Sequence, residues 1–148
     1  MDVILDTSSD WLAIEGAGCE SCLGNTFDTA ASTSAKSIGL TSSERRYGDI
    51  VVTGREWSDK VCLTSDICVT DFSLFLIESQ VFMKEPVDGF LGLAREEPFI
   101  SGKFASMNYK RGASILKAMT DAGKISQRTF SLYLSSGDQD NYIHFGEP

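Results

Sequence analysis

Asp6 is the residue with the clearest potential for chemistry, because it ends an apolar run and opens a polar turn. Val3-Ile4-Leu5 precedes it, and Asp6-Thr7-Ser8-Ser9 makes the turn. A carboxylate placed in this way can act as a general acid or base. Asp-Thr-Ser is also a common turn cap between strands. The turn therefore makes Asp6 a candidate catalytic residue, with a purely structural role as the alternative.

The four cysteines form two close pairs, Cys19 with Cys22 and Cys62 with Cys68. An even number in close pairs favours two local disulfides and an oxidising compartment. A four-thiolate zinc site is a weaker alternative, because the second pair is spaced C-x5-C, wider than usual. Free thiols are a further alternative. Cys19 and Cys22 also match a redox C-x-x-C, but they lie in a glycine-rich loop rather than at a helix start that would depress a thiol pKa.

No other catalytic arrangement can be built from the sequence. His144 is the only histidine, and it lies in an alternating segment typical of a strand. One histidine at the end of the chain gives no Ser-His or Cys-His catalytic pair. Metal-binding spacing is absent too, so we expect no metal and no cofactor.

Composition places the chain among ordinary globular proteins and excludes some partners. Its 148 residues suggest one domain with a core. The net charge of −8 argues against nucleic acid, because phosphates would be repelled. No apolar run is long enough to span a membrane. Residues 1–24 lack the basic start and apolar core of a secretory signal, so we expect no leader within this chain.

The local patterns predict a mainly β chain with one convincing helix. The helix is expected over 113–122, where apolar residues fall at helical spacing and Gly123 is a plausible stop. Val3-Ile4-Leu5 is expected to be a strand buried on both faces. The other expected strands and hairpins lie at 11–14, 47–57, 61–69 with a disulfide across the neck, 72–77, 88–93, and 130–134 with 142–145.

Four separated segments, taken in their order and spacing, carry a family resemblance. They are Leu5–Leu12, Tyr47–Gly54, Val87–Ala94, and Phe130–Ser136 followed by Phe145-Gly146. In that order they are similar to four parts of the pepsin-like aspartic proteases: the hydrophobic-Asp-Thr-Gly-Ser motif, the flap hairpin, the Asp-Gly-hydrophobic-Leu-Gly-Leu strand and the end of the N-terminal lobe. The resemblance implies that residues 1–148 form one such N-terminal lobe, a partly open β-barrel or sandwich of short strands with one or two short helices.

Proteases of this family hydrolyse peptide bonds with two aspartates that share one proton. One acts as general base on a water, and the other donates a hydrogen bond to the scissile carbonyl. Each lobe supplies one aspartate. The resemblance implies that Asp6 is the first of them, that Ser9 orients its carboxylate, and that Thr7 braces the two active-site loops across the lobe interface.

The aspartate motif departs from the family pattern in two ways. Ser8 stands where the family has glycine, and its side chain is expected to crowd the peptide cleft. No second D-T-G or D-S-G occurs, and the nearest look-alike, Asp28-Thr29-Ala30, lacks both the glycine and the preceding apolar run. We therefore expect the C-terminal lobe to be absent from this chain and Asp6, without a partner carboxylate, to titrate near its ordinary value.

The resemblance also implies that Tyr47, Gly48 and Asp49 belong to a flap that closes over substrate. Ala13 occupies the place of the tryptophan that normally bonds the flap tyrosine, so Tyr47 is expected to lose that partner. Ile50 stands where the flap tip usually has a small residue. An ionised Asp49 close to the catalytic carboxylate would raise its pKa.

Two functions follow from the resemblance and its departures. One is an aspartic endopeptidase lobe that supplies one of two catalytic aspartates and is inactive as an isolated chain. The other is a pseudoprotease, a protein-binding or structural subunit that keeps the fold without the chemistry. The partner is then an extended polypeptide substrate or a protein covering the interlobe face. The cysteines and the family imply a secreted, lysosomal or vacuolar setting.

Overall fold

A computed structural model describes residues 1–94, 112–137 and 140–147, and it confirms the mainly β prediction. Most strands belong to one seven-stranded sheet with the order β1-β7-β2-β6-β5-β3, to which β4 is attached through β5. The elements are β1 (Val3–Asp6), β2 (Leu12–Glu15), β3 (Lys36–Ser37), β4 (Ser43–Tyr47), β5 (Ile50–Cys62), β6 (Cys68–Val81), β7 (Gly89–Gly92), α1 (Ile115–Asp121), β8 (Phe130–Tyr133) and β9 (Tyr142–Phe145).

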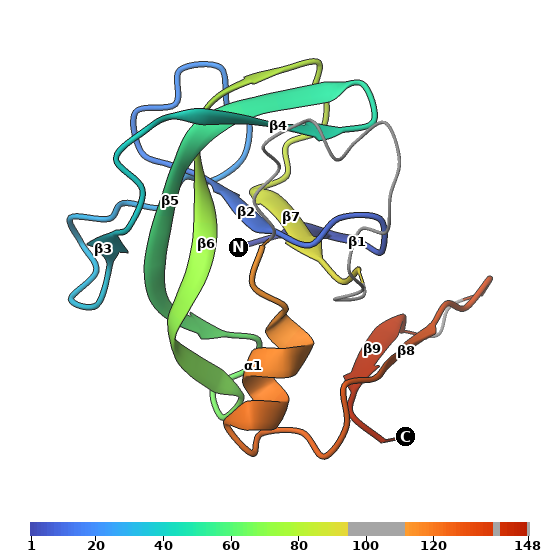
Figure 1. Cartoon of the computed structure of the whole chain (residues 1–148). Coiled ribbons are helices and arrows are strands. Elements are labelled where there is room, and N and C mark those ends of the chain that lie inside the picture. The colour runs from blue at the N-terminus through green and yellow to red at the C-terminus, as the bar shows by residue number, and fades with distance from the viewer. Residues whose placement is uncertain (95–111, 138–139, 148) are drawn as a thin grey trace, which may run out of the picture.

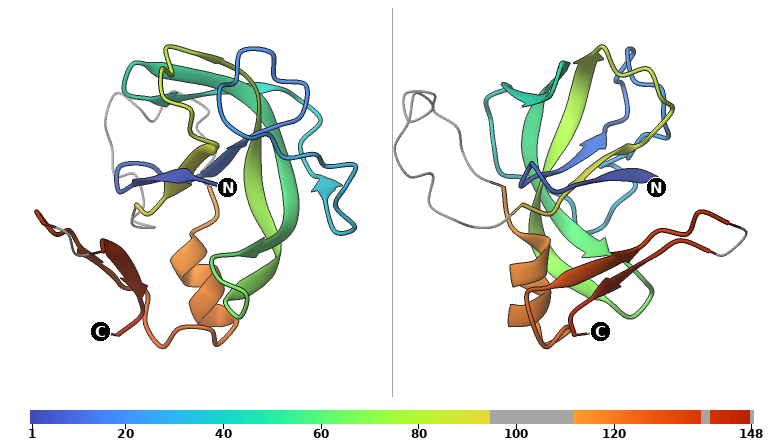
Figure 2. Two further views of the ribbon diagram at one scale, coloured as in Figure 1. Left: turned by 180° about the vertical axis from the view of Figure 1, so that it is seen from behind. Right: turned by 90° about the vertical axis from the view of Figure 1, so that its right-hand side faces the viewer.

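The long strands β5 and β6 form the bent spine of the sheet (Figures 1 and 2). They pair antiparallel, and the pairing shifts register twice, between Thr53 and Gly54 and again between Asp59 and Val61. Such irregularities bend a strand and increase its twist. At the far end Cys62 pairs with Cys68, and the two are joined by a disulfide. The predicted hairpin with a disulfide across its neck is therefore confirmed.

Strand β1 forms where it was predicted, but its burial was predicted wrongly. Ile4 and Leu5 are each 38% exposed, whereas burial on both faces was expected. The reason is that, among the described strands, β1 lies at the edge of the sheet and pairs only with β7, in parallel. An apolar run indicates a strand, but it does not tell whether the chain covers both faces of that strand.

The helix α1 confirms the predicted helical segment and its stop. Its N-cap is Ser114, whose hydroxyl accepts a hydrogen bond from the Lys117 amide (3.2 Å). Gly123 follows the last turn with a φ of 66°, a conformation that favours glycine. Ile115, Leu116 and Met119 are buried in the cluster that also contains Leu12 and Leu91. The helix therefore closes the end of the sheet where β5 and β6 join (Figure 1).

A second apolar cluster lies between β2, β5, β6 and β7. It consists of Trp11, Ala13, Cys19, Val52, Phe75, Ile77, Met83 and Phe90, with Tyr47 and Ile50 packed against it. Tyr47 is the last residue of β4 and Ile50 is the first residue of β5. The cluster therefore packs against the β4–β5 hairpin next to its turn. It also contains Trp11, which follows the Asp6 turn.

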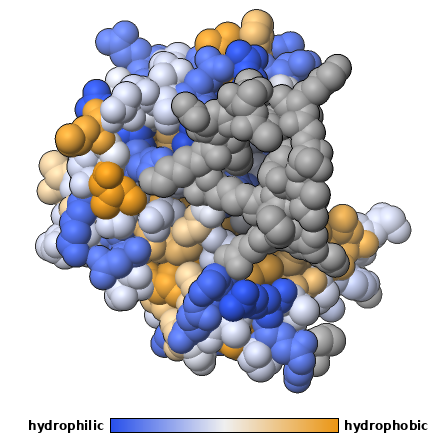
Figure 3. Space-filling view, in the orientation of Figure 1, coloured by the Kyte–Doolittle hydropathy of each residue, from blue (hydrophilic) through white to orange (hydrophobic). Residues whose placement is uncertain are grey.

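Strands β8 and β9 form a separate antiparallel hairpin beside α1 (Figure 2). Several apolar side chains of this hairpin and its flank face solvent: Leu132 is 44% exposed, Tyr142 59% and Leu134 75%. Apolar residues also show at the surface in this region, at the lower right of Figure 3. Within the described residues, no helix has the length and apolar character needed to cross a membrane.

Candidate active site

The turn that carries Asp6 is held by the end of β7. Asp6 is the last residue of β1, and its backbone pairs with Gly92. Three consecutive amides then donate to carbonyl oxygens of the turn: Gly92 to Trp11 (2.8 Å), Leu93 to Asp6 (2.8 Å) and Ala94 to Ser9 (2.9 Å). The first and third motifs of the sequence are thus brought into direct contact. The backbone of the Asp-Gly-Phe-Leu-Gly-Leu segment therefore fixes the conformation of the Asp6 turn.

Gly92 is the residue that permits this close contact. A Cβ atom at this position would lie 2.5 Å from the Trp11 nitrogen, 2.6 Å from the Asp10 carbonyl carbon and 2.7 Å from the Ser9 oxygen. All three are backbone atoms that cannot swing away as a side chain can. A glycine is required here by space, since any side chain would push the turn off the strand.

The hydroxyl group that reaches the Asp6 carboxylate is that of Ser8. Oδ1 of Asp6 accepts hydrogen bonds from the Ser8 amide (2.8 Å) and from the Ser8 hydroxyl (2.6 Å). Ser9 was proposed to orient this carboxylate. Its hydroxyl is buried and, among the described residues, meets no partner with hydrogen-bond geometry. Ser8 is exposed and its hydroxyl points at Asp6, so its side chain helps to hold the Asp6 carboxylate in place.

The pKa of Asp6 is lowered from its ordinary value. Burial of the carboxyl acts in the opposite direction and raises the pKa, but the hydroxyl and amide of Ser8, together with the hydroxyl and amide of Ser9 acting in poorer geometry, outweigh it as hydrogen-bond donors. The prediction of an ordinary pKa was wrong, because it considered the missing carboxylate partner and did not foresee that Ser8 donates to the carboxylate. Asp49 is not among the groups that shift the Asp6 pKa.

Replacing Ser8 with alanine is expected to raise the pKa of Asp6 toward its ordinary value, because the strongest donor to the ionised form is removed. A pH titration of the Asp6 carboxyl carbon by NMR measures this. Ser8→Thr keeps a hydroxyl and serves as the matched control with a smaller shift. If Ser9→Ala raises the pKa more than Ser8→Ala does, Ser9 is the orienting residue.

The β4–β5 hairpin lies above the Asp6 turn on the same side of the molecule (Figures 1 and 2). Its strands meet at the pair Tyr47 and Ile50, with Gly48 and Asp49 forming a two-residue turn. Gly48 has a φ of 60°, which the first position of such a turn requires. Gly48 and Asp49 are both exposed at the tip. The hairpin predicted over 47–57 is therefore longer, with its turn at 48–49.

Tyr47 packs its ring against Phe90 of β7. The two rings are stacked with centroids 4.2 Å apart and an interplanar angle of 7°. Ala13, whose backbone pairs with Phe90, belongs to the same cluster and is small enough to leave this space to the aromatic pair. Tyr47, which was expected to lack a tryptophan partner, thus has an aromatic partner in Phe90 of β7.

The remaining predicted site residue, Thr7, lies exposed in the turn after β1. Its surface is accessible from outside the chain, beside the half-buried carboxylate of Asp6. The structure thus brings Asp6 together with Ser8 and Ser9, and it leaves Thr7, Gly48 and Asp49 open to a molecule outside the chain.

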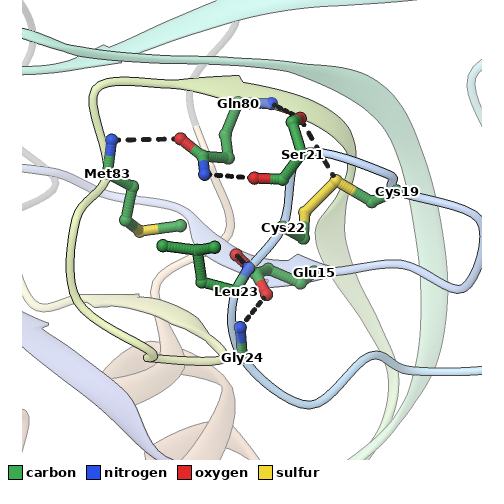
Figure 4. Close-up of a disulfide and its surroundings, with 8 residues drawn as sticks. All are labelled: Glu15, Cys19, Ser21, Cys22, Leu23, Gly24, Gln80 and Met83. Carbon is green, nitrogen blue, oxygen red and sulfur yellow. Dashed lines mark hydrogen bonds between the residues drawn. A yellow bond between two sulfur atoms is a disulfide. The ribbon is translucent and has the colours of Figure 1, made fainter.

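All four cysteine sulfurs are bonded in two disulfides, Cys19–Cys22 and Cys62–Cys68. The zinc and free-thiol alternatives are therefore wrong for this structure, and the predicted pairing into two local disulfides is confirmed. Figure 4 shows the surroundings of the first disulfide. Ser21, between the two cysteines, accepts a hydrogen bond from the Gln80 amide (2.8 Å) and its carbonyl accepts one from the Gln80 side chain. The disulfide loop is thereby fixed to the end of β6.

Sequence reasoning missed the role of Asp88, which it treated only as a turn residue. Asp88 is 1% exposed. Its Oδ2 accepts a bond from the Asp2 amide (2.5 Å), and its Oδ1 accepts bonds from the Asn25 amide (2.6 Å) and side chain (3.2 Å). A signal for this role was available: an aspartate directly before a wholly apolar strand is positioned for burial and must then find donors.

Comparisons with known proteins agree with this geometry. The family model of the eukaryotic aspartyl proteases matches residues 1–147. The chain therefore belongs to the eukaryotic aspartyl protease family, and its fold is that of a pepsin-like N-terminal lobe. The crystal structure of aspartic proteinase from Irpex lacteus is similar, with a TM-score of 0.70 at 16% identity. The match covers 99% of this chain and 40% of that one. No match was found among curated protein sequences.

Proposed function

We propose that this chain supplies Asp6 as one of the two catalytic aspartates of an endopeptidase that acts on extended polypeptides, and that it is inactive alone. The observation that carries the proposal is the Asp6 carboxylate itself. It is accessible, bonded by two donors of Ser8, and fixed by backbone bonds to β7. A positioned carboxylate of this kind suits general acid–base chemistry.

The lowered pKa of Asp6 supports a specific role within such a pair. A general base must be ionised at the working pH, and a depressed pKa keeps Asp6 ionised in acid. A second carboxyl group brought close by another lobe would then hold the shared proton. In this proposal Asp6 activates the water, and the second aspartate donates to the scissile carbonyl.

The exposed groups around Asp6 fit the same proposal. The β4–β5 hairpin would serve as the flap, with Gly48 and Asp49 at its tip over an extended substrate. Thr7, exposed beside Asp6, would contact the partner lobe. The two disulfides suit a secreted, lysosomal or vacuolar protein.

The test is cleavage of an unstructured peptide near pH 4, by the chain alone and by the chain joined to a family C-terminal lobe that carries a second D-[TS]-G. We expect no cleavage by the chain alone and clear cleavage by the joined protein. Asp6→Asn should reduce kcat by about 10²- to 10⁴-fold. The matched control is Asp28→Asn, because Asp28 opens the look-alike Asp-Thr-Ala turn and bonds locally to the Ala30 amide. Equal activity of Asp6→Asn and wild type contradicts the proposal.

A second candidate is a pseudoprotease that binds a protein without cleaving it. The observation that favours it is the group of exposed apolar side chains on β1 and on the β8–β9 hairpin, which includes Ile4, Leu5 and Leu134. Exposed apolar groups of this kind mark interaction surfaces. A joined protein that folds and binds the peptide without cleaving it supports this candidate.

A further inference from the structure

Arg45 is a charged residue inside the apolar cluster beneath the β4–β5 hairpin. It lies on β4 and is 7% exposed. Its guanidinium carbon lies 5.1 Å from the centroid of the Trp11 ring and 4.9 Å from that of Phe75. Both distances fall in the range of cation–π attraction, which is strongest where water is excluded. Arg45 thus contacts two rings from two other parts of the fold.

The polar atoms of the Arg45 guanidinium are directed along the hairpin. Nη1 donates to the Ser43 hydroxyl (3.2 Å) and to the Glu44 carbonyl (3.0 Å), both on β4. Nη2 lies 3.6 Å from a carboxylate oxygen of Glu56, a buried residue of β5. These contacts fix the direction of the guanidinium plane relative to both strands of the hairpin. A planar group held in this way can stack only in one orientation.

The hairpin depends on such side-chain contacts because its outer strand has few other attachments. Among the described strands, β4 pairs only with β5. Trp11 in turn belongs to the Asp6 turn, since its carbonyl accepts the Gly92 amide that holds the turn to β7. The chain of contacts from β4 through Arg45 to Trp11 therefore connects the hairpin to the segment that positions Asp6.

An ordinary packing role does not explain a charge at this place. Burying a guanidinium costs desolvation, and an apolar side chain of similar size fills such a site at lower cost. The guanidinium differs from an apolar side chain because its orientation is fixed. It must pair with Glu56 and donate to the Glu44 carbonyl while its faces contact the two rings. A fixed orientation of the Arg45 side chain would hold the tip of the β4–β5 hairpin at a constant distance from the Asp6 turn.

We propose that Arg45 is a positioning residue that sets the height of the β4–β5 hairpin above the Asp6 turn. The inference rests on the proposed function for its consequence, because a hairpin held in this way serves as a flap over Asp6. The geometric part, that Arg45 holds the hairpin to the Asp6 segment, does not require any cleavage. Arg45 acts through Trp11 and is not itself a catalytic residue.

The first experiment measures amide hydrogen exchange of the purified chain. Arg45→Lys keeps a positive charge that can still lie over a ring, but it loses the planar group that stacks on the rings while bonding Ser43 and the Glu44 carbonyl. It should accelerate exchange at 43–54 by about 10- to 30-fold, the factor that a lost hydrogen bond to a charged group is worth. Amides of α1 and of the β8–β9 hairpin should stay within about 2-fold of wild type, because they are outside this contact. Glu56→Gln, which removes the ion pair and leaves the stack, should have a smaller effect.

The matched control is Arg46→Lys. Arg46 is the next residue of β4 and is exposed, with an ion pair to Glu44 at 2.8 Å. It should leave hairpin exchange unchanged. Equal acceleration in both variants, or in α1 as much as in the hairpin, overturns the proposal, since the effect is then general loss of stability. Unchanged exchange in Arg45→Lys also overturns it.

A second readout separates this inference from the proposed function. In the protein joined to a C-terminal lobe, Arg45→Lys should raise KM by about 10-fold with a smaller change in kcat, because substrate loses contact with a misplaced hairpin. If the joined protein does not cleave at all, the proposed function fails while the exchange result still decides the role of Arg45. Changed hairpin exchange with unchanged KM overturns the link to substrate.

Discussion

Replacing Gly92 with alanine is expected to lower the free energy of unfolding by about 3 kcal/mol and to loosen the Asp6 turn. The added methyl group would meet the Trp11 nitrogen at 2.5 Å and the Ser9 oxygen at 2.7 Å. The strand and the turn must then separate, which strains the three amide-to-carbonyl bonds that join them. Because Asp6 is fixed through these bonds, its carboxylate should lose its defined position as well.

Chemical denaturation measures the stability change, and NMR of the Asp6 carboxyl group measures the local change. Gly137→Ala is the matched control, because the one atom of the described residues that a Cβ there would approach is the Ser135 hydroxyl oxygen, at 3.9 Å. It should be neutral or slightly stabilising, by less than about 1 kcal/mol. A Gly92→Ala protein as stable as Gly137→Ala would mean that the turn can move away from β7 at little cost.

The fold could be predicted largely because its local signals agree with one another. The alternating segments became β8 and β9, the capped segment became α1, and the cysteine pair Cys62–Cys68 marked the neck of the β5–β6 hairpin. The contact between β1 and β7 could not be obtained from such signals. It joins Asp6 to Gly92 across most of the chain, and only the family resemblance related those two motifs.

The sequence does not tell which of two adjacent residues of the same type makes a given contact. Ser8 and Ser9 are both candidates to bond Asp6, and the choice depends on the backbone direction within the turn. Arg45 and Arg46 are likewise adjacent on β4, and strand geometry sends them to opposite faces. Which of the two is buried depends on which face meets Trp11, and that is a property of the whole fold.

The Asp88 carboxylate gives the second large expected effect. Asp88→Asn should lower the free energy of unfolding by about 3 kcal/mol at pH 7. The buried carboxylate accepts bonds from the Asp2 amide, the Asn25 amide and the Asn25 side chain. An asparagine must turn its own NH₂ group toward at least one of these donors, so that two donors face each other. The bonds join the entry of β1 to the start of β7, so the loss affects the strands that carry Asp6.

The pH dependence of this effect follows from the direction of the Asp88 pKa. Burial raises the pKa, but the bonds from Asp2 and Asn25, together with the nearby N-terminal charge, outweigh it, so the folded-state pKa is lowered. The stabilisation is then fully present above the unfolded-state pKa of about 4 and is lost as the pH falls through the lower folded-state value.

Urea unfolding of wild type and Asp88→Asn at pH 7, 5, 4 and 3 should therefore give a constant difference in stability down to about pH 5 and a smaller one at pH 3. Asp28→Asn is the control, because Asp28 is exposed and its carboxylate accepts a bond from the local Ala30 amide (2.9 Å) within its own turn. A difference for Asp88→Asn that grows as the pH falls would mean that the folded state holds the protonated carboxyl group, and that the strands beneath Asp6 are joined by a neutral contact.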